Sequence, residues 1–449
     1  MLAERFIKVV RMILPMPFTI AVILTLFTVI LAIILTDPIQ SNNSPHFMQI
    51  LEFWELGFWD LLKFGMQMTL MLVFGHVLAL TKPIQKLIDL ALKYCTNTSN
   101  SAAIVTVFTL LVTFFNWGLG LIFGAIFARK VAEYAVKNNM ELNYPLIGAA
   151  GYSGLMIWHG GLSGSAPIKV SEEGHFLFDQ IGQILMNETV FSSMNITISM
   201  ILLLILPCSM YWLGGKVKAV PLSITKNEEL EHQPSSKVSG AEKLDHSSWF
   251  CYLFAILILI VGINKALIKP EEVTLRFINP DFINFMLLGL GLALHGTFSK
   301  YLYAVESAIK GTTGIIIQFP IYAGIMGIMK YSGLVMVFSD FFVQISNQTT
   351  FPIFTFISAA LVNIFVPSGG GQWAVQGPII VETAMELGVS IPKCIMALAY
   401  GDQLTNMMQP FWALPLLGIT GLKAKEILPF TLFLMCIGAV VFISGLLIF

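Results

Sequence analysis

Four apolar stretches of the sequence are interrupted by polar, glycine-rich breaks, and these breaks hold the residues that could do chemistry. They read NWGLG (116–120), WHGGLSGSAP (158–167), PSGGGQW (367–373) and GDQLTNMMQP (401–410). A helix that stops inside a membrane exposes backbone N–H groups and a positive dipole end, which favour an anion. Exposed carbonyls and Ser, Asn or Gln side chains can hold a cation. The breaks therefore predict a site for a small anion at the centre of a membrane protein.

Individual residues in the breaks follow from the same reasoning. Asp402 stands out because a carboxylate at membrane depth is costly and usually faces a polar path. Pro367 and the three glycines after it should not continue a helix, and Gly370 should adopt dihedral angles that only glycine reaches cheaply. The predicted substrate- or ion-binding residues are Asn116, Gly118, Gly120, Ser163, Ser165, Asn363, Ser368, Gly369, Gly370, Gly371, Gln372, Gln376, Asp402 and Asn406.

Simpler interpretations compete with these. Glycines in a membrane helix often only permit close packing, the third break could be a surface loop, and Asp402 could lie at the membrane interface. His76 and His295 are interpreted as packing residues. The sequence Gly161-Leu-Ser-Gly164 also fits the GxSG pattern of intramembrane serine proteases, which would require a histidine base beside Ser163.

The composition places the chain in a membrane. Of its 449 residues 56% are hydrophobic and 11% are charged, whereas soluble domains carry about 25% charged residues. The net charge of -1 argues neither for nor against nucleic acid, and because no basic block suggests it, no nucleic acid partner is expected. The five cysteines are scattered without a CxxC pair, so neither disulfides nor a metal centre is expected, and no cofactor is predicted.

Apolar runs of about 20 residues recur along the chain, as bilayer-spanning helices require. The basic residues Arg5, Lys8 and Arg11 precede the first run, which is too long for a signal peptide and predicts a retained helix with a cytoplasmic N-terminus. Segment 37–62 should lie outside and segment 81–101 inside. The clearest predicted spans are 14–36, 64–80, 195–213, 249–268, 282–298, 311–329 and 427–448.

The interrupted stretches predict two re-entrant hairpins, 102–137 and 352–386, and two broken helices, 145–167 and 394–418. Asn116 precedes Pro145 by 145−116 = 29 residues, and Asn363 precedes Pro392 by 392−363 = 29 residues. This match suggests an inverted repeat, a common plan of secondary carriers. The predicted parts are a first membrane repeat (1–214), a cytoplasmic connecting loop (215–248), an extra helix and linker (249–281) and a second, inverted repeat (282–449).

Four stretches closely resemble the bacterial short-chain fatty acid transporter family, and the similarity runs nearly end to end. They are FWDLLKFGMQM (58–68), NWGLGLIFGAIFAR (116–129), VPSGGGQWAVQGP (366–378) and AYGDQLTNMMQPFWALP (399–415). The resemblance implies uptake of acetoacetate- or butyrate-like monocarboxylates across the bacterial cytoplasmic membrane. It also implies a homodimer that binds substrate between two hairpin tips.

The sequence thus predicts an all-α, polytopic, inverted-repeat carrier rather than an enzyme. Its expected partners are a short-chain monocarboxylate, the lipid bilayer and a coupling ion, either H⁺ or Na⁺, with Na⁺ held at the same breaks. Because no arginine occurs in the four breaks, one negative charge on the substrate is favoured over two. The rivals are a Na⁺-coupled dicarboxylate carrier, an intramembrane hydrolase and a channel.

Overall fold

The computed structural model describes residues 15–39, 44–220, 240–268 and 280–449, and every regular element in these ranges is a helix. Seven helical segments there are long and apolar enough to cross a membrane, judged by length and composition. They are α2 (Pro17–Leu35), His46–Ala79, which combines α3 (His46–Phe58) and α4 (Leu62–Ala79), α6 (Thr98–Phe115), α11 (Ser193–Gly214), Ser248–Ala266, α16 (Thr313–Tyr331) and α22 (Ala424–Ile448). The prediction of an all-α polytopic protein is confirmed.

The predicted spans agree with these helices to within a few residues, with two qualifications. The span expected at 282–298 is the shorter helix α14 (Pro280–His295). The basic head that suggested a cytoplasmic N-terminus lies outside the described residues, as do residues 221–239 of the expected connecting loop and 269–279 of the expected linker. The rest of that loop includes α12 (Glu242–Asp245), and the extra helix is α13 (Ser248–Ile263), which continues as a π-helical turn (Asn264–Ile268).

The segment 37–62, which is expected to lie outside, contains a helix. Helix α3 occupies half of it and leads into α4 through a short turn. It packs along α16, where a Cβ built on Gly57 would lie 2.5 Å from Gly327 Cα. Two glycines facing each other let the helix backbones approach closely. The four acidic residues lower the hydropathy of the segment, so a hydropathy pattern does not predict this helix or its packing against α16.

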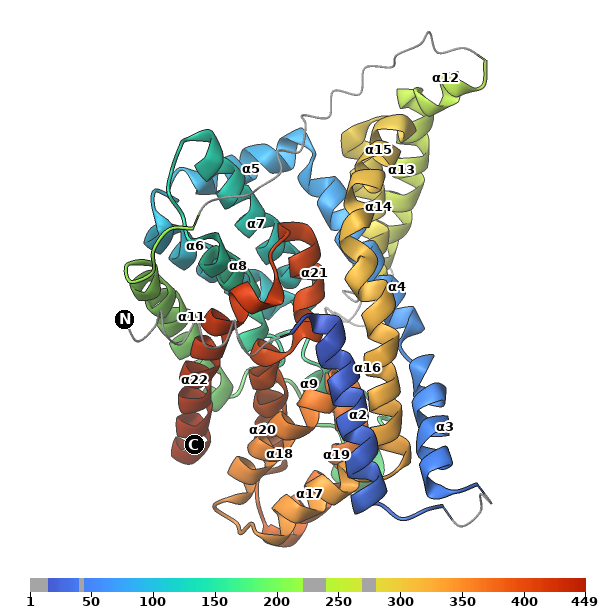
Figure 1. The fold of residues 1–449 in the computed structure, drawn as a ribbon, viewed down its shortest axis with the longest axis vertical. Helices are drawn as coiled ribbons and strands as arrows, with labels where there is room; N and C mark the ends of the chain where they lie inside the picture. The colour runs from blue at the N-terminus through green and yellow to red at the C-terminus, as the bar shows by residue number, and fades with distance from the viewer. Residues whose placement is uncertain (1–14, 40–43, 221–239, 269–279) are drawn as a thin grey trace.

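Short amphipathic helices lie at the two ends of the molecule (Figure 1). Helices α5 (Lys82–Leu92) and α15 (Phe298–Ile309) lie at one end of the molecule together with α12. Helix α17 (Leu334–Gln344) lies at the opposite end, near the start of α3. These helices carry apolar residues on one face and polar residues on the other, as expected of helices at a membrane surface.

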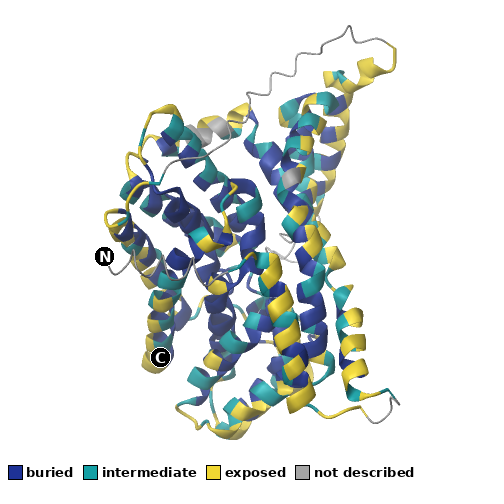
Figure 2. Ribbon diagram, viewed as in Figure 1, coloured by how far each residue is buried: buried dark blue, intermediate teal, exposed yellow. Residues whose placement is uncertain are grey.

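The outermost helices carry many exposed residues (Figure 2), and many of these residues are apolar. On α13, the side chains of Phe254, Leu257 and Val261 are exposed, and on α2 those of Ile23, Leu26 and Ile34. Bands of this kind are unfavourable in water but suit hydrocarbon. Both helices are therefore peripheral, and the interior is built by the interrupted segments.

Both predicted hairpins form as pairs of adjacent helices. The first consists of α6 and α7 (Trp117–Lys137), joined at Asn116, and the second of α18 (Phe351–Phe365) and α19 (Gly369–Leu387), joined at residues 366–368. The expectation that three glycines interrupt the second hairpin is wrong, because Gly369 to Gly371 form the first turn of α19 and none has a positive φ. Only Val366 to Ser368 form the break.

The two broken helices differ from each other. In the second half, α20 (Ile391–Thr405) passes through a 3-10 turn (Asn406–Met408) and resumes as α21 (Pro410–Thr420). In the first half, α8 (Tyr144–Tyr152) passes through a 3-10 turn (Ser153–Met156) into turns at 157–164. The chain then resumes only as α9 (Ser165–Val170) and α10 (Phe178–Ile181) before α11. The order of hairpin, broken helix and long helix thus recurs, and the inverted relation between the halves stays a prediction.

The hairpins can be tested by labelling single cysteines in a variant whose native cysteines are replaced. Lys93→Cys and Asn138→Cys, exposed beside the outer ends of α6 and α7, should react from one membrane face. Asn347→Cys and Glu386→Cys, exposed beside the ends of α18 and α19, should react from the other. A membrane-impermeant maleimide on sealed vesicles reads this out. Opposite reactivity of the two ends of one hairpin would contradict re-entry.

Candidate functional site

The tips of both hairpins contact the break of the first half, residues 157–164. At the first tip, the backbone N–H of Leu162 donates to Phe114 O at 2.8 Å, and the N–H of Trp117 donates to Ser163 Oγ at 2.9 Å. At the second tip, a Cβ built on Gly369 would lie 2.6 Å from His159 Cε1. The breaks that the sequence singles out therefore gather at one buried centre.

Asn116 turns the first tip. It is extended and buried, and its Oδ1 accepts from the N–H of Leu119 at 3.0 Å, so it caps α7 while ending α6. Gly118 and Gly120 lie at tight contacts, since added Cβ atoms would lie 2.9 Å from Met71 Sδ and 2.0 Å from Thr113 Oγ1. Close packing accounts for both glycines, and their part in binding stays a prediction.

A histidine and an aspartate form the only ion pair between the two breaks among the described residues. His159 Nδ1 lies 2.5 Å from Asp402 Oδ2, and the side chains are 0% and 1% exposed. His159 Nε2 accepts the backbone N–H of Ala166 at 3.1 Å, at the start of α9. An imidazole nitrogen that accepts carries no proton, so the proton sits on Nδ1 and points at the carboxylate. The pair drawn in this way carries one net negative charge.

Neighbouring polar side chains hold this pair in place. Gln403 Oε1 accepts from the backbone N–H of His159 at 2.9 Å, which ties the first break to α20. Asn195 of α11 donates to Gly160 O at 2.8 Å, and the hydroxyl of Tyr400 donates to Asn195 Oδ1 at 2.9 Å. The backbone of the break is thus fixed by side chains from α20 and α11.

Asn363, on the last turn of α18, binds the second break. Its Nδ2 lies 2.6 Å from Asp402 O, 2.9 Å from Thr405 Oγ1 and 2.8 Å from Asn406 Oδ1. Three oxygens around two amide protons mean that these contacts share donors. The Oδ1 of Asn363, the Nδ2 of Asn406 and the Oε1 of Gln409 are buried without a partner, so the cluster retains hydrogen-bonding capacity beside Asp402.

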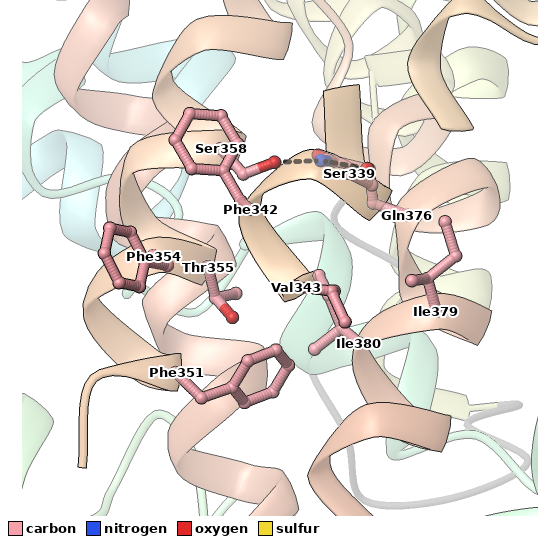
Figure 3. A pocket seen from close by; sticks show the side chains of 10 residues that line it. All are labelled: Ser339, Phe342, Val343, Phe351, Phe354, Thr355, Ser358, Gln376, Ile379 and Ile380. Carbon is pink, nitrogen blue, oxygen red and sulfur yellow. Dashed lines mark hydrogen bonds between the residues drawn. The ribbon is translucent and has the colours of Figure 1, made fainter. Parts of the chain in front are cut away.

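Gln372 and Gln376 lie away from this centre. Gln372 Nε2 donates to Ala359 O at 2.9 Å and to Gln376 Oε1 at 2.8 Å, and Gln376 Nε2 lies within 3.0 Å of Ser339 Oγ and Ser358 Oγ. Figure 3 shows Gln376 and the two serines at the edge of a cavity of about 10 Å³ lined by phenylalanine and aliphatic side chains. That volume suits about one water molecule. The two glutamines bind α19 to α17 and α18, and a direct role in binding stays a prediction.

The starts of α9 and α19 lie close to each other. A Cβ built on Gly370 would meet only Ser165 Cβ, at a van der Waals distance of 3.9 Å, and Gly370 is exposed. Ser368 caps α19 by accepting from the N–H of Gly371 at 3.2 Å. Of the predicted residues, Ser165 and Gly370 thus lie side by side, and Gly369 lies against His159 and Asp402.

Aromatic rings form a wall beside the pair. The ring of Trp158 stacks on that of His159 with centroids 4.3 Å apart, and Trp117 and Trp412 lie 6.0 and 6.4 Å from Trp158. Phe64 of α4 extends the wall at 6.0 Å from Trp117. A polar centre next to such rings can take a ligand with a charged head and a short apolar tail.

Sequence reasoning missed His159, although it named the stretch that contains it. A histidine directly before Gly160 and Gly161 in an apolar run was the available signal, and its aspartate partner lies 243 residues away. The hydrolase interpretation needed a histidine beside Ser163. In the structure both ring nitrogens of His159 are engaged elsewhere, and Ser163 accepts from Trp117.

Metal ligands are sparse within the described ranges, where no group of three or more His, Cys, Asp or Glu residues could hold a metal ion. The Na⁺ considered from the sequence stays a prediction.

Comparison with known proteins decides the family. A family model described as "Short chain fatty acid transporter" matches residues 1–449. The chain belongs to the short-chain fatty acid transporter family. It is 36% identical over 440 residues to a protein of Escherichia coli (strain K12) named as a candidate short-chain fatty acid transporter, covering 97% of this chain and 96% of the relative. A Haemophilus influenzae protein with the same name is 35% identical over 454 residues, covering 96% of each.

Two solved structures are similar to this transporter over nearly its whole length. The Alcanivorax borkumensis YdaH transporter aligns with a TM-score of 0.45 and 13% identity, covering 97% of both chains. Neisseria gonorrhoeae MtrF, described as an antimetabolite efflux pump, aligns with a TM-score of 0.43 and 13% identity, covering 99% of this chain and 97% of its own. The family assignment rests on the sequence matches.

The glycines of the second tip offer a matched test of the transporter's site. In Gly369→Ala the new methyl would collide with His159 Cε1, whereas in Gly370→Ala it would meet only Ser165 Cβ at a van der Waals distance. We expect Gly369→Ala to lower stability by about 1–3 kcal/mol, as overpacking does, and to slow transport. Gly370→Ala should keep or slightly raise stability, because alanine favours a helix over glycine. Thermal unfolding in detergent measures both, and equal destabilisation would contradict the contact.

Proposed function

We propose that this protein is a secondary active carrier of short-chain monocarboxylates, such as acetoacetate or butyrate, across the bacterial cytoplasmic membrane. The observation that carries the proposal is the meeting of both hairpin tips at one break, beside a buried carboxylate and an aromatic wall. Family membership supports the substrate class, and the apolar helices support a multi-pass protein.

The shape of the site supports a small amphipathic anion. The start of α19, a helix of 19 residues, lies beside Ser165 with Gly370 exposed, and the backbone N–H groups of a helix N-terminus favour a carboxylate. The tryptophans at 117, 158 and 412 supply an apolar face for the acyl chain. A longer chain would have to displace these packed rings.

The charges near the site favour a monocarboxylate over a dicarboxylate. None of the four breaks contains an arginine, and the single lysine adjoining them, Lys169, pairs with Glu172 at 2.7 Å on the exposed side of α9. A second carboxylate would therefore lack a cationic partner. The alternative of a Na⁺-coupled dicarboxylate carrier requires partners that these described residues do not offer.

Coupling to a cation follows from the charge of Asp402. Two unit negative charges about 4 Å apart repel by about 4 kcal/mol at an effective dielectric constant of about 20. A carboxylate substrate would meet this repulsion unless a cation, H⁺ or Na⁺, neutralised the centre. Binding of the anion and of the cation would then favour each other, which is the thermodynamic requirement for symport.

Proteoliposomes test the proposed function. Labelled butyrate and acetoacetate should accumulate against their gradients when an inward proton or sodium gradient is imposed, and excess unlabelled propionate should compete. Succinate in the same excess should compete weakly because its second carboxylate finds no cation. Protein-free vesicles supply the control for diffusion of the neutral acids. Strong competition by succinate together with weak uptake of butyrate would favour the dicarboxylate alternative.

A further inference from the structure

We propose that the coupling ion is a proton and that the pair His159–Asp402 is its binding site, with Asp402 carrying the proton and His159 positioning it. The inference rests on the proposed function and goes beyond it by naming the ion and the residues. The geometry of the pair supports it in three steps.

The first step is the proton count of the pair. With Nε2 accepting from Ala166 N and Nδ1 donating to Asp402, the imidazole is neutral and the carboxylate is charged. The imidazole cannot take a second proton without breaking the bond from Ala166, because a protonated ring has no acceptor. An additional proton therefore goes to the carboxyl group of Asp402, and the pair becomes neutral.

The second step is that the surroundings leave this charge without another partner. The titratable side chains that hydrogen-bond at these breaks are Tyr152 of α8, whose hydroxyl donates to Asn406 O at 2.7 Å, and Tyr400 of α20, which donates to Asn195. Glu382 and Glu386 of α19 and Lys393 of α20 lie more than two turns along their helices from Gly369 and Asp402. The remaining neighbours, Gln403, Asn363 and Trp158, are uncharged. Lys169 of α9 is paired with Glu172. The negative charge of Asp402 therefore has no cationic side chain to balance it. A proton bound to the carboxyl group would neutralise this charge while the hydrogen bond from the imidazole stays in place.

The third step links the proton to access. Gly369 lies against both members, since its built Cβ would be 2.6 Å from His159 Cε1 and 3.2 Å from Asp402 Oδ2. The second hairpin tip therefore covers the pair, and any movement of that tip that admits a substrate also admits water. In each cycle one monocarboxylate anion and one proton would cross together, so that no net charge moves. Asp402 takes up the proton on one side and releases it on the other.

Exchange of labelled for unlabelled butyrate, at equal concentration and equal pH on both sides of proteoliposomes, tests the site without a driving gradient. In sodium-free buffer, wild-type exchange should fall about tenfold per pH unit above its midpoint, as expected when a single protonated group is required. Rates in protein-free vesicles are subtracted at each pH, since the neutral acid diffuses by itself.

Three variants separate proton binding from folding. Asp402→Asn imitates the neutral form and should exchange at a rate independent of pH, while losing accumulation driven by a proton gradient. Asp402→Glu should restore the pH dependence. His159→Phe keeps the stacking on Trp158 but removes the N–H donated to the carboxylate, so the midpoint of the exchange profile should differ from that of wild type. Asp340→Asn, the same change on an exposed residue of α17, should match wild type.

Fluorescence gives a readout that needs no substrate. Because Trp158 stacks on His159, tryptophan emission of the purified protein in detergent should show a pH transition that Asp402→Asn lacks and Trp158→Phe weakens. The same titration shows whether Asp402→Asn is folded. If wild type exchanges no monocarboxylate but shows the transition, the proposed function fails and the proton site stands. Exchange that requires Na⁺, or a pH dependence retained in Asp402→Asn in both assays, would overturn the proton site.

Discussion

The structure depends on one buried hydrogen bond to a carboxylate, between His159 in the first half of the chain and Asp402 in the second. Removing a carboxylate from water costs several kcal/mol even after the protein relaxes, and a partner repays this only with close geometry. The contact of 2.5 Å, with both side chains buried, meets that condition. A neutral imidazole compensates the charge by one hydrogen bond rather than by an opposite charge. The pair is therefore held in place but not neutralised, which suits a site that must change its state during a cycle.

The broken helices are tolerated because each half satisfies the backbone of the other. A helix that ends in the interior leaves N–H and C=O groups without partners, and lipid offers none. Here Gln403 accepts from the N–H of His159, and the hydroxyl of Tyr152 donates to Asn406 O. Asn195 and Ser163 serve Gly160 O and Trp117 N in the same way. The bonds of Gln403 and Tyr152 join the halves at the point where their helices are broken, and those of Asn195 and Ser163 hold the first half together there. The breaks are therefore a source of cohesion as well as of binding capacity.

Much of the fold could be predicted from the sequence because the bilayer imposes length and apolarity on each span, and both hairpin turns coincide with a predicted break. The helix α3 escaped because its fit to α16 relies on Gly57 and Gly327, a contact between distant segments. The sequence predicts a break at glycines 369–371, whereas they form the start of α19. Three glycines after a proline fit a loop as well as a helix start, and the hydrogen bond by which Ser368 caps α19 is visible only in the structure.

The site was predictable only in part, for a related reason. Asp402 and Asn363 stand out as polar groups in apolar surroundings, and the structure does bring them together. His159 was not singled out, because its partner Asp402 lies 243 residues away in the sequence. Gln372 and Gln376 carry side chains that could bind a ligand, yet the Gln372 amide donates to Ala359 O and Gln376, and the Gln376 amide donates to Ser339 and Ser358. Residue type indicates what a side chain can bind, but the fold determines whether groups of the protein itself already occupy its hydrogen-bonding atoms.

The contact between Gly369 and the ion pair has a consequence for how charge and access are related. In the proposed cycle, the tip that covers Asp402 would have to open before water or a substrate reached the carboxylate. Proton binding and closure of the tip would then be coupled, and the effect of each on the other would be reciprocal. The anion would be held best with the tip closed, because water beside its carboxylate would weaken the N–H contacts from α19. Closure would then favour the state that carries substrate and proton together. Glycine at position 369 allows the start of α19 to lie against His159 and Asp402, so that closure of the tip and protonation of Asp402 are coupled.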